Sequence, residues 1–376
     1  MKKAIYLDYN ATTPLAPEVI AEMRPYLTEY FGNPSSAHEY GISAKQAVNK
    51  ARRQVAALLG TKAENIIFTS GGTEANNQAI KGIAFENQQR GKHIITCSIE
   101  HPAVLEVCRY LEKQHGFRIT FLQVDSDGLI DLDELRAAIC PETILITIMQ
   151  ANNEIGTIQP IAEIAKIARE NKIVFHTDAA QSLGKIPVNV EELQVDLLTV
   201  AGHKLYAPKG VGALYIRAGV RLEKFMHGAA HENNLRAGTE NVLEIVGLGQ
   251  AAEIASRDLE KNFQQLQATR DLLQKELCRA FPGAQINGSQ KFRLPNTLNI
   301  SLPQLDYYKL MEYFVYVAAS AGSACHSASA EISPVLAALR ADPDLARKTI
   351  RFSTGRQTSK TDILQAVNYL KQVCQM

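Results

Sequence analysis

The sequence lacks an excess of charge of either sign. Its 40 Lys and Arg residues are balanced by 39 Asp and Glu residues, so the formal net charge is +1. Such a chain has no electrostatic drive toward nucleic acid or an anionic membrane. It also lacks an apolar run near the roughly 18 residues of a membrane span, and its first residues lack the apolar core of a signal peptide. We therefore expect a cytoplasmic protein that binds neither nucleic acid nor a membrane.

Paired cysteines are absent as well. The six cysteines are scattered along the chain, and none of them forms a Cys-x-x-Cys pair. This pattern suits a reducing compartment better than a disulfide framework or a zinc site. We expect no metal, and we expect most of these thiols to be small buried side chains. Cys325 is the candidate exception.

Helical patterns alternate with short apolar runs between about residues 43 and 217. Residues 43–59 predict an amphipathic helix that ends at Gly60. Runs such as NIIFTS, TILITIMQA and IVFHTDA predict strands that are buried on both faces of a sheet. This alternation is typical of an α/β fold with a mainly parallel sheet.

The rhythm changes in the last third of the chain. Residues 241–280 predict a long helical stretch, and strand-like runs then precede a final helix at 359–373. Because 376 residues exceed the usual size of a single core, we expect a large domain and a small α+β domain. We assign residues 14–255 to the large domain, and 1–13 together with 256–376 to the small one.

Unusual polar residues follow several of the apolar runs, at the strand ends where open α/β sheets bind ligands. Gly71 and Gly72 separate a predicted strand from a helix that starts near Thr73. The free N–H groups of such a helix start bind phosphate. A tight turn with Thr73 as the helix cap explains the same residues equally well. Neither glycine-rich nucleotide motif is present, so a nucleotide is not favoured.

His101 and Asp178 each follow a predicted strand. An imidazole in that place could stack on a flat cofactor or move protons, although a lone histidine is more commonly a cap or a surface residue. A carboxylate at the end of a buried strand is costly unless it is paired, and a protonated ring nitrogen would be a suitable partner. The alternative is a helix-capping aspartate.

Two cations are also out of place. Lys204 follows the apolar run DLLTVA, and a partly desolvated lysine can form a Schiff base. The alternative is a surface lysine, a role that suits Lys209 better. Arg351 lies inside the predicted strand TIRFST, where it could bind a carboxylate or form a structural salt bridge.

Cys325 lies among small residues, with His326 beside it. Sulfur transfer needs a thiolate, and the pKa of free cysteine is about 8.5, so a cationic or basic neighbour would help. A small buried cysteine in a turn is the alternative. Together, a phosphate pocket, a ring-binding carboxylate, a stacking histidine, a Schiff-base lysine and a carboxylate-binding arginine describe a pyridoxal-phosphate site.

From LDYNATTP to IRFSTGRQTS the chain resembles the cysteine desulfurases of the NifS/IscS type, within the class-V aminotransferase group. The motifs that carry this resemblance include FGNPSSAH, FTSGGTEANN, HTDAAQSLGK, GHKLYAPKGVGALY, LRAGTEN and GSACHS. It implies fold type I of the pyridoxal-phosphate transferases and a homodimer. It also implies that L-cysteine becomes L-alanine while the sulfur stays as a persulfide for an acceptor protein, for iron–sulfur clusters or thiolation.

The resemblance also assigns individual residues. It implies that Lys204 forms the Schiff base, that Cys325 carries the persulfide, and that His101 stacks on the ring and handles protons. The other implied roles are cofactor and substrate contacts: Asp178 at the pyridine nitrogen, Gln181 at the phenolic oxygen, Gly72, Thr73 and His203 at the phosphate, Thr239 at the phosphate of the partner subunit, Asn153 at cofactor and substrate, and Asn33 and Arg351 at the substrate.

The chain departs from the family pattern in three places. Ala201 replaces a usual serine, residues 228–232 read Gly-Ala-Ala-His-Glu in place of Gly-Gly-Gly-Gln-Glu, and His326 replaces Ser or Thr. Because the AGHK and ACHS contexts resemble selenocysteine lyases, a selenocysteine lyase or another carbon–sulfur lyase is an alternative. A non-catalytic sulfur carrier is a further one. The chain also stops soon after its last predicted helix, where many relatives continue into a scaffold-docking tail.

Overall fold

The computed structural model describes residues 4–321 and 332–375. A seven-stranded sheet with the order β2-β8-β7-β6-β5-β3-β4 forms its larger part. The neighbours from β7 to β4 are parallel, whereas β8 runs antiparallel to β7 and β2. The predicted α/β fold with a mainly parallel sheet is confirmed. The strands are β2 (Ile66–Thr69), β3 (His93–Cys97), β4 (Arg118–Leu122), β5 (Thr143–Thr147), β6 (Val174–Asp178), β7 (Leu197–Ala201) and β8 (Gly212–Ile216).

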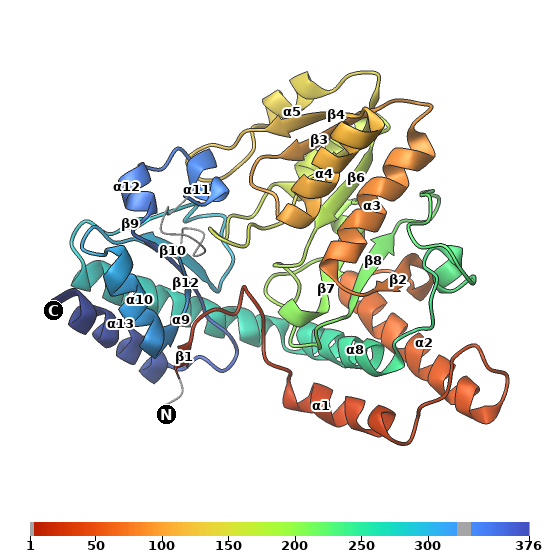
Figure 1. Ribbon diagram of the computed structural model, residues 1–376, viewed down its shortest axis with the longest axis horizontal. Helices are drawn as coiled ribbons and strands as arrows, with labels where there is room; N and C mark the ends of the chain where they lie inside the picture. The colour runs from red at the N-terminus through yellow and green to blue at the C-terminus, as the bar shows by residue number, and fades with distance from the viewer. Residues whose placement is uncertain (1–3, 322–331, 376) are drawn as a thin grey trace.

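Helices cover both faces of this sheet (Figure 1). Helices α3 and α4 pack on one face, and α2, α6 and α8 pack on the other. The helices of this part are α1 (Pro17–Met23), α2 (Glu39–Leu59), α3 (Gly72–Asn87), α4 (Pro102–His115), α5 (Leu132–Ala138), α6 (Ile161–Glu170), α7 (Val190–Leu193) and α8 (Val242–Arg257).

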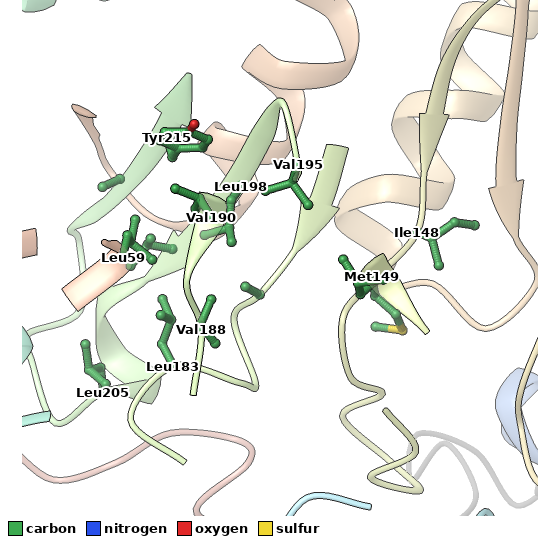
Figure 2. Packing of buried hydrophobic residues seen from close by; sticks show 14 of the residues in the cluster. Leu59, Ile148, Met149, Leu183, Val188, Val190, Val195, Leu198, Leu205 and Tyr215 are labelled. Carbon is green, nitrogen blue, oxygen red and sulfur yellow. The ribbon is translucent and has the colours of Figure 1, made fainter. Parts of the chain in front are cut away.

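The two-sided burial explains why the strands are apolar almost throughout. Successive residues of a strand face opposite sides, so Ile94 belongs to the core under α3 and α4, and Ile95 belongs to the core on the other face. Figure 2 shows part of this second core, in which Leu198 and Tyr215 of the sheet gather with Leu59 and Val190.

Local signals set the ends of several helices. Gly60 ends α2 and Gly116 ends α4, both in the left-handed conformation that glycine adopts without strain. Pro102 lies in the first turn of α4. The helix predicted at 43–59 begins four residues earlier, at Glu39, because His38 caps it by accepting a hydrogen bond from the Gly41 N–H at 3.4 Å.

A four-stranded sheet, β12-β13-β10-β9, and the parallel pair β1-β11 form the smaller part. Strand β13 is antiparallel to both β10 and β12. The elements are β1 (Ile5–Tyr6), β9 (Gln285–Ile286), β10 (Thr297–Ser301), β11 (Val317–Ala318), β12 (Ser320–Ala321), β13 (Thr349–Ser353), α9 (Leu259–Ala280), α10 (Tyr307–Tyr316), α11 (Pro334–Ala338), α12 (Pro343–Ala346) and α13 (Lys360–Gln375).

The long helical stretch expected at 241–280 is divided. Asp258, with φ −103°, separates α8 from α9, and the two helices together run beneath both sheets (Figure 1). The smaller part has its own core, built from α9, α10, α13 and the strands, yet Val335 and Leu336 of α11 pack on the core of the large sheet. The division into residues 14–255 and the remainder stays a prediction.

The described residues contain no helix that is long and apolar enough to cross a membrane.

Candidate active site

A cavity of about 430 Å³ opens at the carboxyl ends of the central strands. Nine of the residues singled out in the sequence line it, although they come from well-separated segments. They are Gly72, Thr73, His101, Asn153, Asp178, Gln181, His203, Lys204 and Arg351. Crossovers between parallel strands bring the residues after β2, β3, β5, β6 and β7 to this edge of the sheet.

Asp178 is the last residue of β6 and is only 6% exposed. Its Oδ2 accepts a hydrogen bond from the Asn76 side chain at 2.7 Å, and its Oδ1 accepts one from the Ala180 N–H at 2.9 Å. The next helix, α7, starts only at Val190, so the helix-capping alternative for Asp178 is wrong. The carboxylate is held by neutral donors and borders the cavity.

His101 is both a helix cap and a cavity residue, the two roles that its position in the sequence allowed. It caps α4, because its Nδ1 accepts the Ala103 N–H at 3.1 Å, and it also lines the cavity. Burial lowers the pKa of His101, while Asp178 opposes that shift and Lys204 adds to it. A neutral ring whose Nδ1 accepts a hydrogen bond carries its proton on Nε2.

Lys204 ends a short 3₁₀ turn, Gly202–Lys204, directly after β7. Its Nζ donates to the backbone carbonyls of Asn10 and, at 2.8 Å, of Ala11. Burial, followed by the nearby Arg351, lowers the pKa of Lys204 to about 8. Lys204 is therefore no surface lysine, whereas Lys209 is exposed as expected.

The start of α3 offers free N–H groups to the same cavity. Gly71 is the N-cap residue and no side chain caps the helix, so the reading of Thr73 as the cap is wrong. A Cβ built at Gly72 would come within 3.1 Å of the Ala201 side chain, which leaves little room for a larger residue. Beside it, the His203 Nδ1 lies 3.2 Å from the Thr12 hydroxyl, and burial lowers the pKa of His203 to about 4.

Arg351 forms a structural ion pair and also reaches the cavity. One nitrogen, Nη2, donates to Asp8 and to the Ser320 hydroxyl, both at 2.7 Å. Its Nη1 donates to the Asn153 carbonyl at 3.1 Å. The buried Nε has no partner within the described residues, so its N–H and the second N–H of Nη1 make no hydrogen bond there.

Three predicted site residues are not among those lining the cavity. Asn33 is exposed, and its side chain accepts a hydrogen bond from the Ser35 N–H at 2.9 Å. Thr239 is exposed and borders a separate hollow with Glu240. Cys325 lies outside the described residues, as does His326.

The substituted stretch 228–232 contains a buried anchor. Glu232 receives two hydrogen bonds of 2.6 Å from the Arg52 guanidinium and one of 2.7 Å from the Phe68 N–H. This pair ties the stretch to α2 and β2. His231 beside it contacts the Ser35 hydroxyl at 3.2 Å.

Two polar residues that line the cavity, and one that lies behind it, were not predicted from the sequence. Asn10 lines the cavity from the loop after β1, and no local pattern marks it. Asn76 stands four residues after Gly72, so helical spacing placed both on one face of α3. Lys185 stands four residues after Gln181 and donates to it at 2.8 Å, a contact that depends on the fold of the loop after β6.

The cavity residues fit a phosphorylated pyridine aldehyde. The site supplies an amine of lowered pKa, a buried carboxylate, an imidazole and a helix start from different segments. The carbonyl oxygen of the Asn76 side chain is buried with no partner within the described residues. That oxygen and the Nε of Arg351 could form hydrogen bonds with polar groups of a ligand. Among the described residues, no cluster of three or more His, Cys, Asp or Glu could hold a metal.

Comparison with known proteins gives concordant results. The family described as aminotransferase class-V matches residues 5–365. The cysteine desulfurase IscS of Dictyoglomus turgidum is 49% identical over 99% of this chain and 95% of its own. A solved NifS-like protein has a TM-score of 0.92 with 36% identity, covering 99% of both chains. The structure of SspA in complex with cysteine has a TM-score of 0.83 with 38% identity, covering 94% of this chain and 99% of that one.

Proposed function

The chain belongs to the class-V aminotransferase family and to its cysteine desulfurases of the NifS/IscS type, and from that premise we propose that it converts L-cysteine to L-alanine and keeps the sulfur on Cys325. One observation carries the proposal: Lys204, Asp178 and His101 come from the ends of three different strands and line one cavity with Arg351. This combination of side chains is what cysteine chemistry on pyridoxal phosphate requires.

We propose pyridoxal phosphate as the cofactor. Asp178 would pair with its ring nitrogen, Gln181 would contact its phenolic oxygen, and His101 would stack on the ring. The start of α3 at Gly72 and Thr73, together with His203, would hold the phosphate. When bound, the cofactor would act as an electron sink for the charge left by removal of the substrate Cα proton.

The protonation states of Lys204 and His101 suggest different roles for the two side chains. With a pKa of about 8, Lys204 is partly neutral near neutral pH, so it would serve as the nucleophile and as a base. The neutral His101 already uses Nδ1 as an acceptor. Its Nε2–H would therefore donate a hydrogen bond to a ligand, because a neutral imidazole that lost this proton would become an imidazolate.

Arg351 would bind the substrate carboxylate. Two of its nitrogens are held by Asp8, Ser320 and Asn153, so the guanidinium plane is fixed before a ligand arrives. A fixed guanidinium loses little rotamer freedom when it binds a carboxylate. Asn153 would contact both cofactor and substrate, and Asn33 the substrate.

The family resemblance points to Cys325 as the sulfur carrier, and its distance along the chain from the cavity is compatible with that role. It stands five residues after Ser320, which touches Arg351 at 2.7 Å, and five residues of chain span at most about 18 Å. Burial raises the pKa of Cys97, and it raises that of Cys108 to about 12. Neither thiol would supply a thiolate to a substrate in the cavity.

The test of the sulfur carrier is the exchange Cys325→Ser, with Cys278→Ser as the control because Cys278 is an exposed thiol on α9. With an added thiol as the reductant that releases sulfide from a persulfide, we expect the Cys325 variant to stay yellow with cofactor but to stop releasing sulfide from cysteine. The control should keep full turnover. Alanine and sulfide are measured together. Full turnover by Cys325→Ser would favour a carbon–sulfur lyase that needs no persulfide.

We also propose a cytoplasmic homodimer that passes its sulfur to an acceptor protein, for iron–sulfur clusters or thiolation. The exposure of Thr239 supports a role for it at the phosphate of the partner subunit. A parallel assay with cysteine and selenocysteine, in which alanine is measured, separates this function from a selenocysteine lyase.

A further inference from the structure

Lys185 is a buried lysine for which the described residues provide no carboxylate partner. It is 6% exposed and lies in the loop after β6. Its Nζ donates to the Asn10 Oδ1 at 3.0 Å and to the Gln181 Oε1 at 2.8 Å. Burying an ammonium between two neutral amides is costly, so the residue needs an explanation beyond packing.

The number of acceptors matches a neutral amine. A neutral amine has two N–H donors, whereas an ammonium has three, and Lys185 makes two hydrogen bonds. The charged groups that act on it are both cations, Lys204 from the turn after β7 and Arg351 from β13. Burial is the main cause that lowers the pKa of Lys185 well below its usual value, and these cations add to it.

These two hydrogen bonds determine how the neighbouring amides are turned. In the structure Lys185 donates to both amides, and the oxygen of each amide faces it. The Gln181 Nε2 then donates to the Asn10 backbone carbonyl at 3.0 Å, and its second N–H is left for the cavity that Gln181 lines. The same Asn10 carbonyl accepts from the Lys204 Nζ. Asn10 therefore connects Lys185 with both Gln181 and Lys204.

We propose that Lys185 is a positioning residue, which as a neutral amine helps to hold the Gln181 amide so that its free N–H faces the cavity and helps to keep Asn10 in place for Lys204. Without Lys185, only the hydrogen bond from the Gln181 Nε2 to the Asn10 carbonyl would hold the orientation of the Gln181 amide. The neutral state also keeps a third positive charge away from Lys204 and Arg351. The ligand in this inference rests on the proposed function, whereas the neutral amine does not.

The neutral state is tested on the cofactor-free protein with Lys185→Met. In the unfolded chain a lysine titrates near 10.4, so the loss of a proton on folding costs free energy in the wild type at pH 7 and costs much less near pH 10. The melting temperature of the wild type should therefore rise relative to that of the variant between pH 7 and 10. Lys166→Met, which removes an exposed lysine of α6, should show no such trend. If the difference in melting temperature between the wild type and Lys185→Met did not change with pH, Lys185 would not be a neutral amine in the folded protein.

Positioning is tested by titrating pyridoxal phosphate into the same cofactor-free proteins and following visible absorbance. We expect Lys185→Met to weaken binding on the order of tenfold, as the loss of one or two hydrogen bonds implies. In a Gln181→Ala background, Lys185→Met should weaken cofactor binding far less, because Lys185 acts through Gln181. Equal losses in both backgrounds would overturn the positioning role.

A second variant separates the loss of the N–H donor from a general folding defect of Lys185→Met. Lys185→Gln keeps a neutral N–H donor, so it should retain more cofactor affinity than Lys185→Met, and affinity no better than that of the methionine variant would count against the inference. If the wild type itself bound no pyridoxal phosphate, the proposed function would fail. The pH dependence of the melting temperature would still decide the state of Lys185.

Discussion

Lys204 shows how the surroundings of one side chain change its chemistry. Its amine lies between two backbone carbonyls and near the Arg351 guanidinium. Burial disfavours the charged form and Arg351 repels it, so the pKa falls to about 8. Asp8 and Asp178 oppose this shift, and a lysine with the same carboxylates in water would stay protonated.

This lowered pKa can be measured without the cofactor. In the cofactor-free protein, the rate at which an amine-reactive reagent labels Lys204 should rise through about pH 8, since only the neutral amine reacts. Arg351→Met should move the midpoint upward, because it removes a nearby positive charge and leaves Asp8 without its partner. Mass spectrometry of the labelled peptide gives the rates. An unchanged midpoint in Arg351→Met would refute the electrostatic coupling.

At the scale of elements, β6 carries buried polar side chains through the middle of the sheet. The two ring nitrogens of His176 contact the Thr147 hydroxyl of β5 at 2.8 Å and the Thr199 hydroxyl of β7 at 3.0 Å. Residues two apart on a strand share a face, so Asp178 points to the same side as His176. This three-strand contact holds the strand that ends at the cavity.

The contact makes the sheet sensitive to acid. Burial lowers the pKa of His176 to about 3, whereas an unfolded histidine titrates near 6.5. Between these values the unfolded chain binds the extra proton, so stability rises with pH and is lost as pH falls below about 6.5. His176→Gln should reduce this dependence by up to about 1.4 kcal/mol per pH unit.

Urea unfolding at several pH values between 4 and 7 provides the measurement. His227→Gln is the matched control, because His227 is exposed and its removal should leave the pH dependence unchanged. If the free energy of unfolding changed with pH in the same way for the wild type and for His176→Gln, His176 would not be kept neutral in the folded protein.

At the scale of the whole molecule, the N-terminal segment joins the two sheets at the active site. Strand β1 pairs with β11, and Asn10 then bonds to Thr297 of β10, to Ser353 of β13 and to Lys185. The cavity is therefore completed by contacts between the two sheet systems. The proposed dimer would complete it further with Thr239 of the partner subunit.

The dimer is tested by complementation. Lys204→Ala should be colourless and inactive, and Thr239→Ala should be weakly active at limiting cofactor. When both chains are co-expressed, a mixed dimer would combine the intact Lys204 of one chain with the intact Thr239 of the other. We expect activity per chain above that of either variant alone, measured as alanine formed. No gain, with dimers confirmed by light scattering, would place Thr239 outside the partner's site.

Much of this fold follows from short-range rules. Burial on both faces makes β2 and β5 mainly apolar, glycine in the left-handed conformation ends α2 and α4, and Pro102 starts α4. These signals act within a few residues, so they can be read in the chain itself. The same holds for Lys204, Asp178 and His101, whose residue types are unusual after buried strands. The break at Asp258 has no such local mark.

Which elements form, and which reactive side chains follow them, can be read from the chain itself, because backbone conformation depends mainly on near neighbours. The packing of distant segments was needed to show that His101 is both a helix cap and a cavity residue, that Asn10 lines the cavity and that Lys185 lies behind it. These roles depend on contacts between distant segments: the Asn10 N–H reaches the Ser353 hydroxyl across 343 positions of the chain. No local pattern encodes such a contact, since the packing of both sheets creates it.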